Sequence, residues 1–320
     1  MKKINASHTP LYREAGFNLK DAKTTKAAFE SELNNPHEPD NYIYSRYRNP
    51  TVVEVEKQFM KLENSNWALL VGTGMAAIDV AVSIFQEGKN TKPWLFFSEI
   101  YGGTNSFIDT VLIKRRNIDV HRFYAEEGNY NFIKLEETLK SIKPEFIYFE
   151  AVSNPMLIVA DVEKIISLAK KYNSKIIVDN TFGTPYLWKP LADGADLVIH
   201  SATKYLSGHG NITAGVICGN DGELLKKAIE YRKWVGHFLS PDDAYRLGTQ
   251  VKSFNLRFKQ HCKNALVLAK YLNEHSKIEK VLYPGLPSHK THKEAVKLFN
   301  EKGFGGIITF TIKGNSEKDK

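Results

Sequence analysis

Residues 175–210 read KIIVDNTFGTPYLWKPLADGADLVIHSATKYLSGHG and contain two apolar segments that each end in polar side chains. The first segment ends at Asp179, and the second leads into Ser201, Thr203 and Lys204. A continuous apolar run is typical of a strand that is buried on both faces of a parallel sheet. Because ligands of open α/β sheets bind beyond the carboxyl ends of the strands, we expect these four side chains at the ligand-binding edge.

Apolar strands and amphipathic helices alternate on both sides of this stretch. One helix is well marked, because Asp161 can cap it and apolar residues recur at helical spacing from Val162 to Ala169. Further strands are expected at Trp67–Val71, Trp94–Phe97, Ile118–Phe123, Phe146–Phe149 and Ala214–Cys218, and further helices over Met75–Gln86 and from Thr104. The sequence therefore predicts an α/β protein with a mostly parallel sheet that helices cover on both faces.

The pattern changes twice along the chain and predicts three parts. Residues 1–60 are polar and expected to be irregular, as an arm on the chain's own surface or on a neighbouring subunit. Residues 61–240 form a large α/β domain, and residues 241–320 begin an α+β domain. In this last part we expect helices over Pro241–Phe258 and Lys259–Glu274 and strands over Ile278–Tyr283 and Gly306–Ile312. These elements are too few to close a domain, so we expect a sequence that is shortened at its C-terminus, Asn315–Lys320.

Composition excludes several classes of protein. The chain of 320 residues has 44 basic and 36 acidic side chains, a net charge of +8. The charges are spread over amphipathic helices such as Glu223–Lys233, which is typical of solvated faces and argues against nucleic-acid binding. Two cysteines form no disulfide framework, the first ten residues have no apolar core of a signal peptide, and no apolar run reaches 18 residues. We therefore expect a cytoplasmic protein that does not bind membranes, and the ten histidines show no metal-ligand spacing.

A glycine-rich turn follows the first strand of the α/β region. Gly72, Gly74 and Ala77 fit the G-x-G-x-x-A pattern of a dinucleotide site, and Glu99 lies where a ribose-binding acid would stand. The physical content of the pattern is less specific, because glycines at a helix N-terminus present backbone N–H groups to any anion. A nicotinamide dinucleotide, another phosphate and a purely structural turn all remain open on this motif alone.

The polar groups at the two strand ends indicate a different cofactor. Asp179 could cap a turn, but a buried carboxylate there could also hold a pyridine nitrogen protonated and make the ring an electron sink. The hydroxyls of Ser201 and Thr203 beside Lys204 suit a phosphate and an aldehyde together.

On these motifs the chain resembles the pyridoxal-phosphate (PLP) enzymes of transsulfuration, which include cystathionine γ-synthase, cystathionine γ-lyase, methionine γ-lyase and O-acetylhomoserine sulfhydrylase. The resemblance covers about residues 8–313. The matching stretches are Tyr44-Ser-Arg-Tyr-Arg-Asn-Pro-Thr51, Gly74-Met75, Tyr101-Gly-Gly-Thr104, Glu150 with Ser153-Asn-Pro155, Val178-Asp-Asn-Thr181, Ser201-Ala-Thr-Lys-Tyr-Leu-Ser-Gly-His209 and Tyr283-Pro-Gly-Leu-Pro-Ser-His289.

The resemblance implies the PLP-dependent transferase fold of type I, which is like that of aspartate aminotransferase. It also implies roles for individual residues. Lys204 binds PLP as a Schiff base and later moves protons, Asp179 pairs with the pyridinium nitrogen, and Asn154 donates to the phenolic oxygen of the ring. Tyr101 stacks on the ring and acts as a base. The phosphate contacts are implied at Gly74 and Met75, at Ser201 and Thr203, and at Tyr44 and Arg46 reaching from a neighbouring subunit of an obligate homo-oligomer, a dimer of dimers.

Some positions depart from the family pattern and leave the substrate open. Methionine γ-lyases carry a cysteine two residues after the stacking tyrosine, where this chain has Gly103. Tyr283–His289 favours cystathionine γ-lyase, whereas Gly208–Thr213 is more like methionine γ-lyase. The arginine that binds the substrate carboxylate in this family falls beyond Lys320.

The resemblance therefore predicts γ-elimination or γ-replacement on a small substrate, either a sulfur amino acid or an activated homoserine. The main prediction is lyase activity like that of cystathionine γ-lyase or methionine γ-lyase. The alternative prediction is cystathionine γ-synthase or O-acetylhomoserine sulfhydrylase activity. Two hypotheses from other classes remain, a Rossmann-type NAD oxidoreductase and a shortened family member without catalysis.

Overall fold

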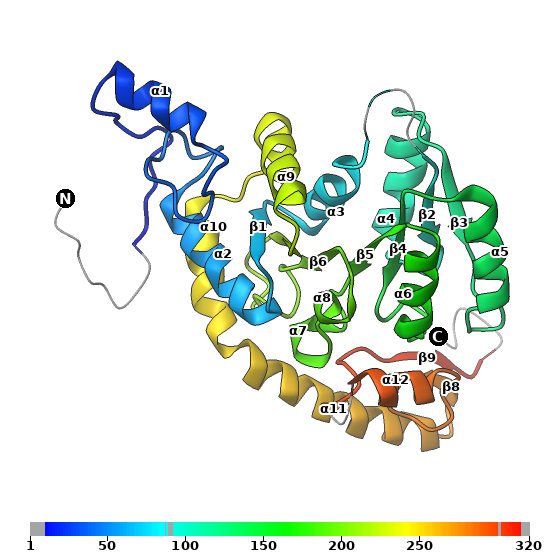
Figure 1. Ribbon diagram of the computed structural model, residues 1–320. Coiled ribbons are helices and arrows are strands. Elements are labelled where there is room, and N and C mark those ends of the chain that lie inside the picture. Colours follow the sequence, from blue (N-terminus) through cyan, green and yellow to red (C-terminus); the bar gives the residue numbers. More distant parts are fainter. Residues whose placement is uncertain (1–9, 87, 89–91, 300–301, 315–320) are drawn as a thin grey trace. The chain divides into compact units, whose positions relative to one another are not determined.

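The computed structural model describes residues 10–86, 88, 92–299 and 302–314 (Figure 1). Contacts between Cα atoms divide the chain into two compact units, Met1–Gln86 with Asp196–Phe254 and Glu87–Ala195 with Asn255–Lys320. Each unit thus combines two separate pieces of chain. The division at residues 60 and 240 stays a prediction, and the expectations for residues 1–9 and for Asn315–Lys320 lie outside the described residues.

In the first unit the strands lie in the order β1 (Trp67–Val71), β7 (Gly215–Gly219) and β6 (Leu197–Ser201). β7 pairs antiparallel with both neighbours and is the exception to the parallel arrangement that its apolar sequence indicated. An apolar run indicates burial on both faces but not strand direction. The segment between β6 and β7 contains no helix, so it does not form the helical crossover that usually joins parallel strands.

The first unit also contains helices that the sequence interpretation missed. Residues 1–60 were expected to be irregular, which is wrong for residues 22–30 and from residue 50 onward. Asn49 caps the helix that begins at Pro50 by accepting a hydrogen bond from the Thr51 N–H, and proline suits its first turn. The helices of this unit are α1 (Ala22–Glu30), α2 (Pro50–Glu63), α3 (Gly74–Ser83), α9 (Gly222–Val235) and α10 (Pro241–Gln250), with a 3₁₀ turn at Val251–Ser253.

α2 and α10 lie side by side (Figure 1). A Cβ atom at Gly248 would lie 2.7 Å from Cγ2 of Val55, so glycine allows the close contact between the two helices.

The second unit contains four parallel strands in the order β5 (Lys175–Asp179), β4 (Phe146–Glu150), β2 (Trp94–Phe97) and β3 (Val120–Phe123). This arrangement confirms the α/β prediction. Asp161 caps α6 as expected, with its side chain accepting from the Lys164 N–H. The helices here are α4 (Gly102–Phe107), a π-helix at Ile108–Ile113, α5 (Phe132–Ile142), α6 (Val162–Lys171), α7 (Thr184–Leu187) and α8 (Pro190–Asp193).

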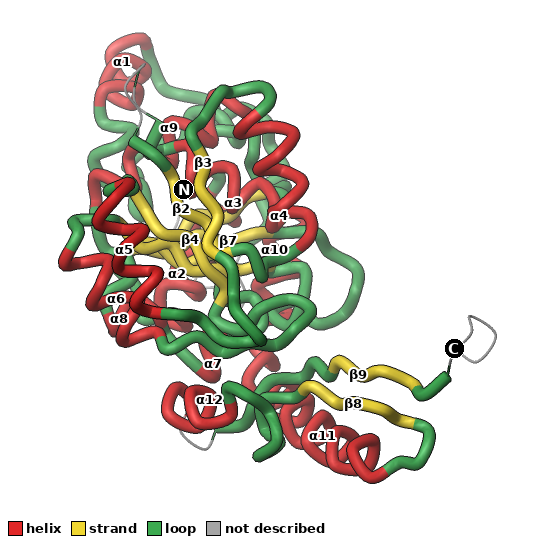
Figure 2. The backbone as a smooth tube through the Cα atoms, turned by 90° about the vertical axis from the view of Figure 1, so that its right-hand side faces the viewer, coloured by secondary structure: helices red, strands yellow, loops and turns green. Residues whose placement is uncertain are grey.

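The C-terminal part of the second unit is a small α+β layer. α11 (Phe254–Glu274) runs along an antiparallel pair, β8 (Ile278–Leu282) and β9 (Thr309–Ile312), and α12 (His292–Phe299) lies between the two strands in sequence (Figure 2). Ala265 and Ala269 of α11 form a buried cluster with Val281, Tyr283 and Leu286.

The predicted break between the two long helices at residues 258 and 259 is wrong. The regular helix is interrupted at Val251–Ser253 instead, where no proline or glycine marks the change. In the described part of the chain, no helix is long and apolar enough to cross a membrane.

Candidate active site

In the first unit the N-terminus of α3 lies against the end of β6. A Cβ atom at Gly74 would stand only 2.8 Å from Cβ and Oγ of Ser201, closer than real Cβ contacts allow, so glycine is required here. Thr73 caps α3 through the Ala76 N–H, at 2.9 Å. The first N–H groups of a helix, which include those of Gly74 and Met75, have no partner within the helix and favour an anion. The local arrangement therefore fits a phosphate.

Thr203 and Lys204 lie in the turn after β6. The Thr203 hydroxyl accepts the Ala214 N–H at 3.0 Å and donates to the Ala214 carbonyl at 3.2 Å. A phosphate contact by Thr203 would require its O–H to turn away from that carbonyl. The Lys204 N–H donates to the Ser201 carbonyl at 3.1 Å, and the Lys204 side chain is exposed, which leaves its amine accessible to an aldehyde.

Tyr44 and Arg46 form part of an aromatic and cationic stack in the same unit. The Arg46 guanidinium lies 5.6 Å from the ring centre of Tyr44 and 5.5 Å from that of Tyr47. Tyr44 is 42% exposed, whereas Nε of Arg46 is buried and has no hydrogen-bond partner among the described residues. A guanidinium that lies beside two aromatic rings suits an anionic group.

In the second unit two carboxyl groups meet at the ends of neighbouring strands. Glu150 and Asp179 are register partners on β4 and β5, and both are buried. Tyr148 donates its O–H to Oδ2 of Asp179 at 3.3 Å, and the Thr181 N–H donates to Oδ1 at 2.9 Å. Burial raises the pKa of Glu150 well above its ordinary value, and the charge of Asp179 raises it further. This pair favours a cation beside it, as a protonated pyridine nitrogen would be.

Glu150 also fixes the backbone of Tyr101, the tyrosine that is expected to stack on the ring. Its Oε1 accepts the Tyr101 N–H at 2.6 Å, at the start of α4. Tyr101 is 47% exposed, and a Cβ atom at Gly103 would lie 2.3 Å from Cε1 of its ring. Gly103 thus leaves the space in which the ring lies. The Asn154 backbone also hydrogen-bonds to Glu150, which ties Asn154 and Tyr101 to one carboxyl group.

The structure brings the expected residues together in two groups. Gly74 lies against Ser201 in the first unit, with Thr203 and Lys204 in the adjoining turn, while Glu150 links Tyr101, Asn154 and Asp179 in the second unit. Glu150 appeared in the sequence only as part of a motif and received no role. A signal was present, because Glu150 ends a buried apolar strand in the same way as Asp179 does.

The dinucleotide hypothesis is wrong. In a dinucleotide-binding unit the strand before the glycine-rich turn is parallel to its neighbours, whereas β1 pairs antiparallel with β7. Oε1 of Glu99 accepts the Ala125 N–H at 3.0 Å, so this carboxylate holds a loop rather than standing free for a ribose.

The model of the family described as "Cys/Met metabolism PLP-dependent enzyme" matches residues 1–320. This chain belongs to that family. PLP is therefore its cofactor, and the family recognition from motifs is confirmed. The chain is an enzyme of the PLP-dependent transsulfuration type.

Individual relatives span several activities. A cystathionine β-lyase of Lactococcus lactis subsp. cremoris (strain MG1363) is 36% identical over 283 residues, which are 88% of this chain and 72% of that protein. An L-methionine γ-lyase of Fusobacterium nucleatum subsp. polymorphum is 35% identical over 97% of this chain and 75% of that protein. Cystathionine β-lyase was not among the activities that the motifs indicated.

A solved structure confirms the fold. The crystal structure of cystathionine γ-synthase from Xanthomonas oryzae pv. oryzae in complex with cystathionine matches with a TM-score of 0.85 at 26% identity, and the match covers 98% of this chain and 75% of that one. The chain thus has the PLP-dependent transferase-like α/β fold that the resemblance implied.

Proposed function

We propose that this chain breaks or exchanges a C–S bond of a sulfur amino acid, or replaces the leaving group of an activated homoserine, with Lys204, Asp179 and Tyr101 as its catalytic residues. The observation that carries the proposal is the buried pair of Glu150 and Asp179, because it combines a partner for a protonated ring nitrogen with a fixed position for Tyr101. The names of the matched relatives support the class of substrate.

The bound cofactor would supply an electron sink for the negative charge that develops at the substrate's α-carbon. Lys204 would hold it covalently, and its freed amine would accept the α-proton. Asp179 would keep the proton on the ring nitrogen, and Asn154 would donate to the phenolic oxygen. Tyr101 would cover one face of the ring and exclude water there. The phosphate would lie among Gly74, Met75, Ser201 and Thr203, with Tyr44 and Arg46 from a neighbouring subunit.

An oligomeric state follows from this assignment. Tyr44 is 42% exposed, as expected for a group that reaches into a site of another copy. We therefore propose a homo-oligomer, with a dimer of dimers as the simplest arrangement. A cytoplasmic location stays a prediction.

The position of bond cleavage can be read from products. With cystathionine and water, cleavage at the γ-carbon gives cysteine, 2-oxobutyrate and ammonia, whereas cleavage at the β-carbon gives homocysteine, pyruvate and ammonia. Gly103 and the Tyr283–His289 stretch favour cystathionine as the substrate and 2-oxobutyrate as the product, whereas the Gly208–Thr213 stretch favours methionine, so both substrates are tested.

The test is incubation of the PLP-loaded protein with cystathionine, with methionine, and with O-acetylhomoserine plus a thiol. We expect a keto acid or a new thioether from at least one of these, and its loss in Lys204→Ala. Turnover that survives Lys204→Ala would contradict the proposal. Full PLP loading without any product would favour the non-catalytic alternative.

A further inference from the structure

Arg232 is buried, although it lies in the stretch Glu223–Lys233 that was interpreted as a solvated face. Its exposed fraction is 2%, so that interpretation is wrong at this position. The physical reason is helical spacing, because Arg232 follows the buried Leu225 by seven residues and the buried Ile229 by three on α9. Burial lowers the pKa of Arg232 to about 10, which leaves the guanidinium charged at neutral pH.

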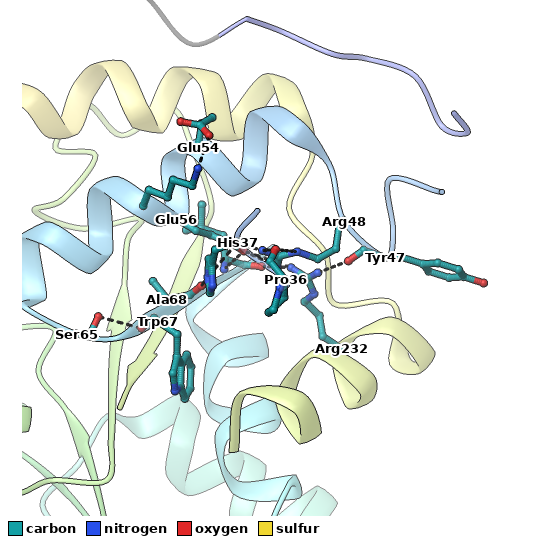
Figure 3. A network of polar contacts seen from close by, with 12 residues as sticks. Pro36, His37, Tyr47, Arg48, Glu54, Glu56, Ser65, Trp67, Ala68 and Arg232 are labelled. Carbon is teal, nitrogen blue, oxygen red and sulfur yellow. Dashed lines mark hydrogen bonds and ion pairs between the residues drawn. The ribbon is translucent and has the colours of Figure 1, made fainter. Parts of the chain in front are cut away.

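The two ends of the guanidinium join separate segments of the chain (Figure 3). Nη1 donates to the Leu70 carbonyl at 3.1 Å, near the end of β1. Nη2 donates to the Tyr47 carbonyl at 2.5 Å. A planar guanidinium fork can make both bonds at once, which a lysine ammonium cannot do in the same geometry.

Glu56 completes the connection from α2. Its Oε1 accepts the Leu70 N–H at 3.0 Å and lies 3.6 Å from Nη1 of Arg232. Its Oε2 accepts from Nη2 of Arg48 at 2.6 Å (Figure 3). Arg48 in turn donates from Nε to the Pro36 carbonyl at 2.9 Å. Glu56, Arg48 and Arg232 are all at most 4% exposed. Charged hydrogen bonds of this kind are strong and directional when buried.

These contacts also satisfy the outer edge of β1. Among the described strands of the first unit, β1 is the end strand and pairs with β7, so the backbone groups on its outer edge need other partners. Side chains supply these partners, with Glu56 and Arg232 on Leu70 and His37 at 2.9 Å from the Ala68 carbonyl. The strand is therefore fixed up to the point where it enters the Gly72–Gly74 turn.

We propose that Arg232 is a positioning residue for phosphate binding, because its guanidinium holds two backbone segments at once. One is the strand that leads to Gly74 in the chain's own site, and the other is Tyr47, next to Arg46, which we assign to the phosphate of a neighbouring subunit. The inference rests on the proposed function and deepens it. The hydrogen bonds of Arg232 go to the Leu70 and Tyr47 carbonyls rather than to Gly74 or Arg46. Arg232 sets the backbone on which both are carried.

The experiment measures two affinities by absorbance titration, one for PLP and one for pyridoxal, which lacks the phosphate. It compares the wild type with Arg232→Met and Arg232→Lys. We expect PLP to bind about tenfold more weakly in both variants, and pyridoxal to change by less than about twofold. Lys226→Met is the charge-matched control, because it removes one exposed cation from the same helix and should leave both affinities unchanged. If Arg232→Met does not fold, Arg232→Lys carries the test, since it keeps the buried charge and removes the fork.

The results distinguish a failure of the role of Arg232 from a failure of the proposed function. Equal losses for PLP and pyridoxal, or no loss for either, would overturn the role of Arg232 while the proposed function stands. A wild-type protein that takes up no PLP would overturn the proposed function itself and the role of Arg232 with it.

Discussion

Glu150 and Asp179 stand opposite each other at the carboxyl ends of the parallel strands β4 and β5. Both are buried, and each is held by backbone N–H groups, from Tyr101 on one side and from Thr181 on the other. Two carboxyl groups so placed repel each other as anions, and a cation between them and the solvent relieves that repulsion. The pair therefore gives the second unit a position that favours a cation such as a protonated pyridine nitrogen.

Asp179→Asn tests the charge of this pair. An amide cannot keep a pyridine nitrogen protonated, so we expect turnover to fall by about 100-fold or more, as when one partner of a buried charge pair is removed. Steady-state rates of the PLP-loaded variant measure the effect. Tyr148→Phe is the matched control, because it removes the 3.3 Å hydrogen bond to Oδ2 but keeps the Asp179 carboxylate, so it should cost at most about tenfold. Equal rates for Asp179→Asn and the wild type would contradict the role.

Glu150→Gln tests the raised pKa of Glu150. A carboxyl group with a pKa that is higher in the folded than in the unfolded state stabilises the fold below the unfolded value of 4.5, and this contribution is lost as pH rises through the folded value. In cofactor-free protein, Glu150→Gln should therefore gain stability relative to the wild type as pH increases above about 4.5. Urea unfolding of both proteins at pH 5 and at pH 8 measures the difference. A difference that is the same at both pH values would show that Glu150 titrates normally.

Gly74→Ala tests the contact between α3 and β6. The added methyl group would meet Ser201 at 2.8 Å and push the helix N-terminus away, so we expect PLP to bind about tenfold or more weakly. Gly222→Ala is the control, since a Cβ atom there meets nothing within 4 Å. PLP affinity that is unchanged in Gly74→Ala would show that the phosphate lies elsewhere.

Thr291→Val tests a buried hydrogen bond in the second unit. Oγ1 of Thr291 accepts the Val159 N–H at 2.9 Å, and valine would leave this donor buried without a partner. We expect the free energy of unfolding to fall by about 1–3 kcal/mol. Thr138 is half-buried and donates its hydroxyl to the Lys134 carbonyl of its own helix, so Thr138→Val leaves no buried N–H without a partner and should change the free energy of unfolding by less than about 0.5 kcal/mol. Denaturant titration distinguishes the two variants, and equal values for both would contradict the assignment.

The sequence predicted those features that depend on local chemistry. The end of the apolar run before Asp179 and the cap at Asp161 follow from neighbouring residues alone, and both appear as expected. The antiparallel direction of β7 does not follow from its own residues, because burial on two faces is compatible with either strand direction. The helical spacing of Arg232 was visible, but its partners Leu70 and Tyr47 are more than 160 residues away in sequence, and only the fold brings them together.

The most direct test of the central claim is to load the protein with PLP, reduce it with borohydride and map the modified peptide. We predict a yellow protein whose visible absorption disappears on reduction, with the reduced group on Lys204. A reduced group on another lysine, or a protein that stays colourless with PLP present, would contradict the account.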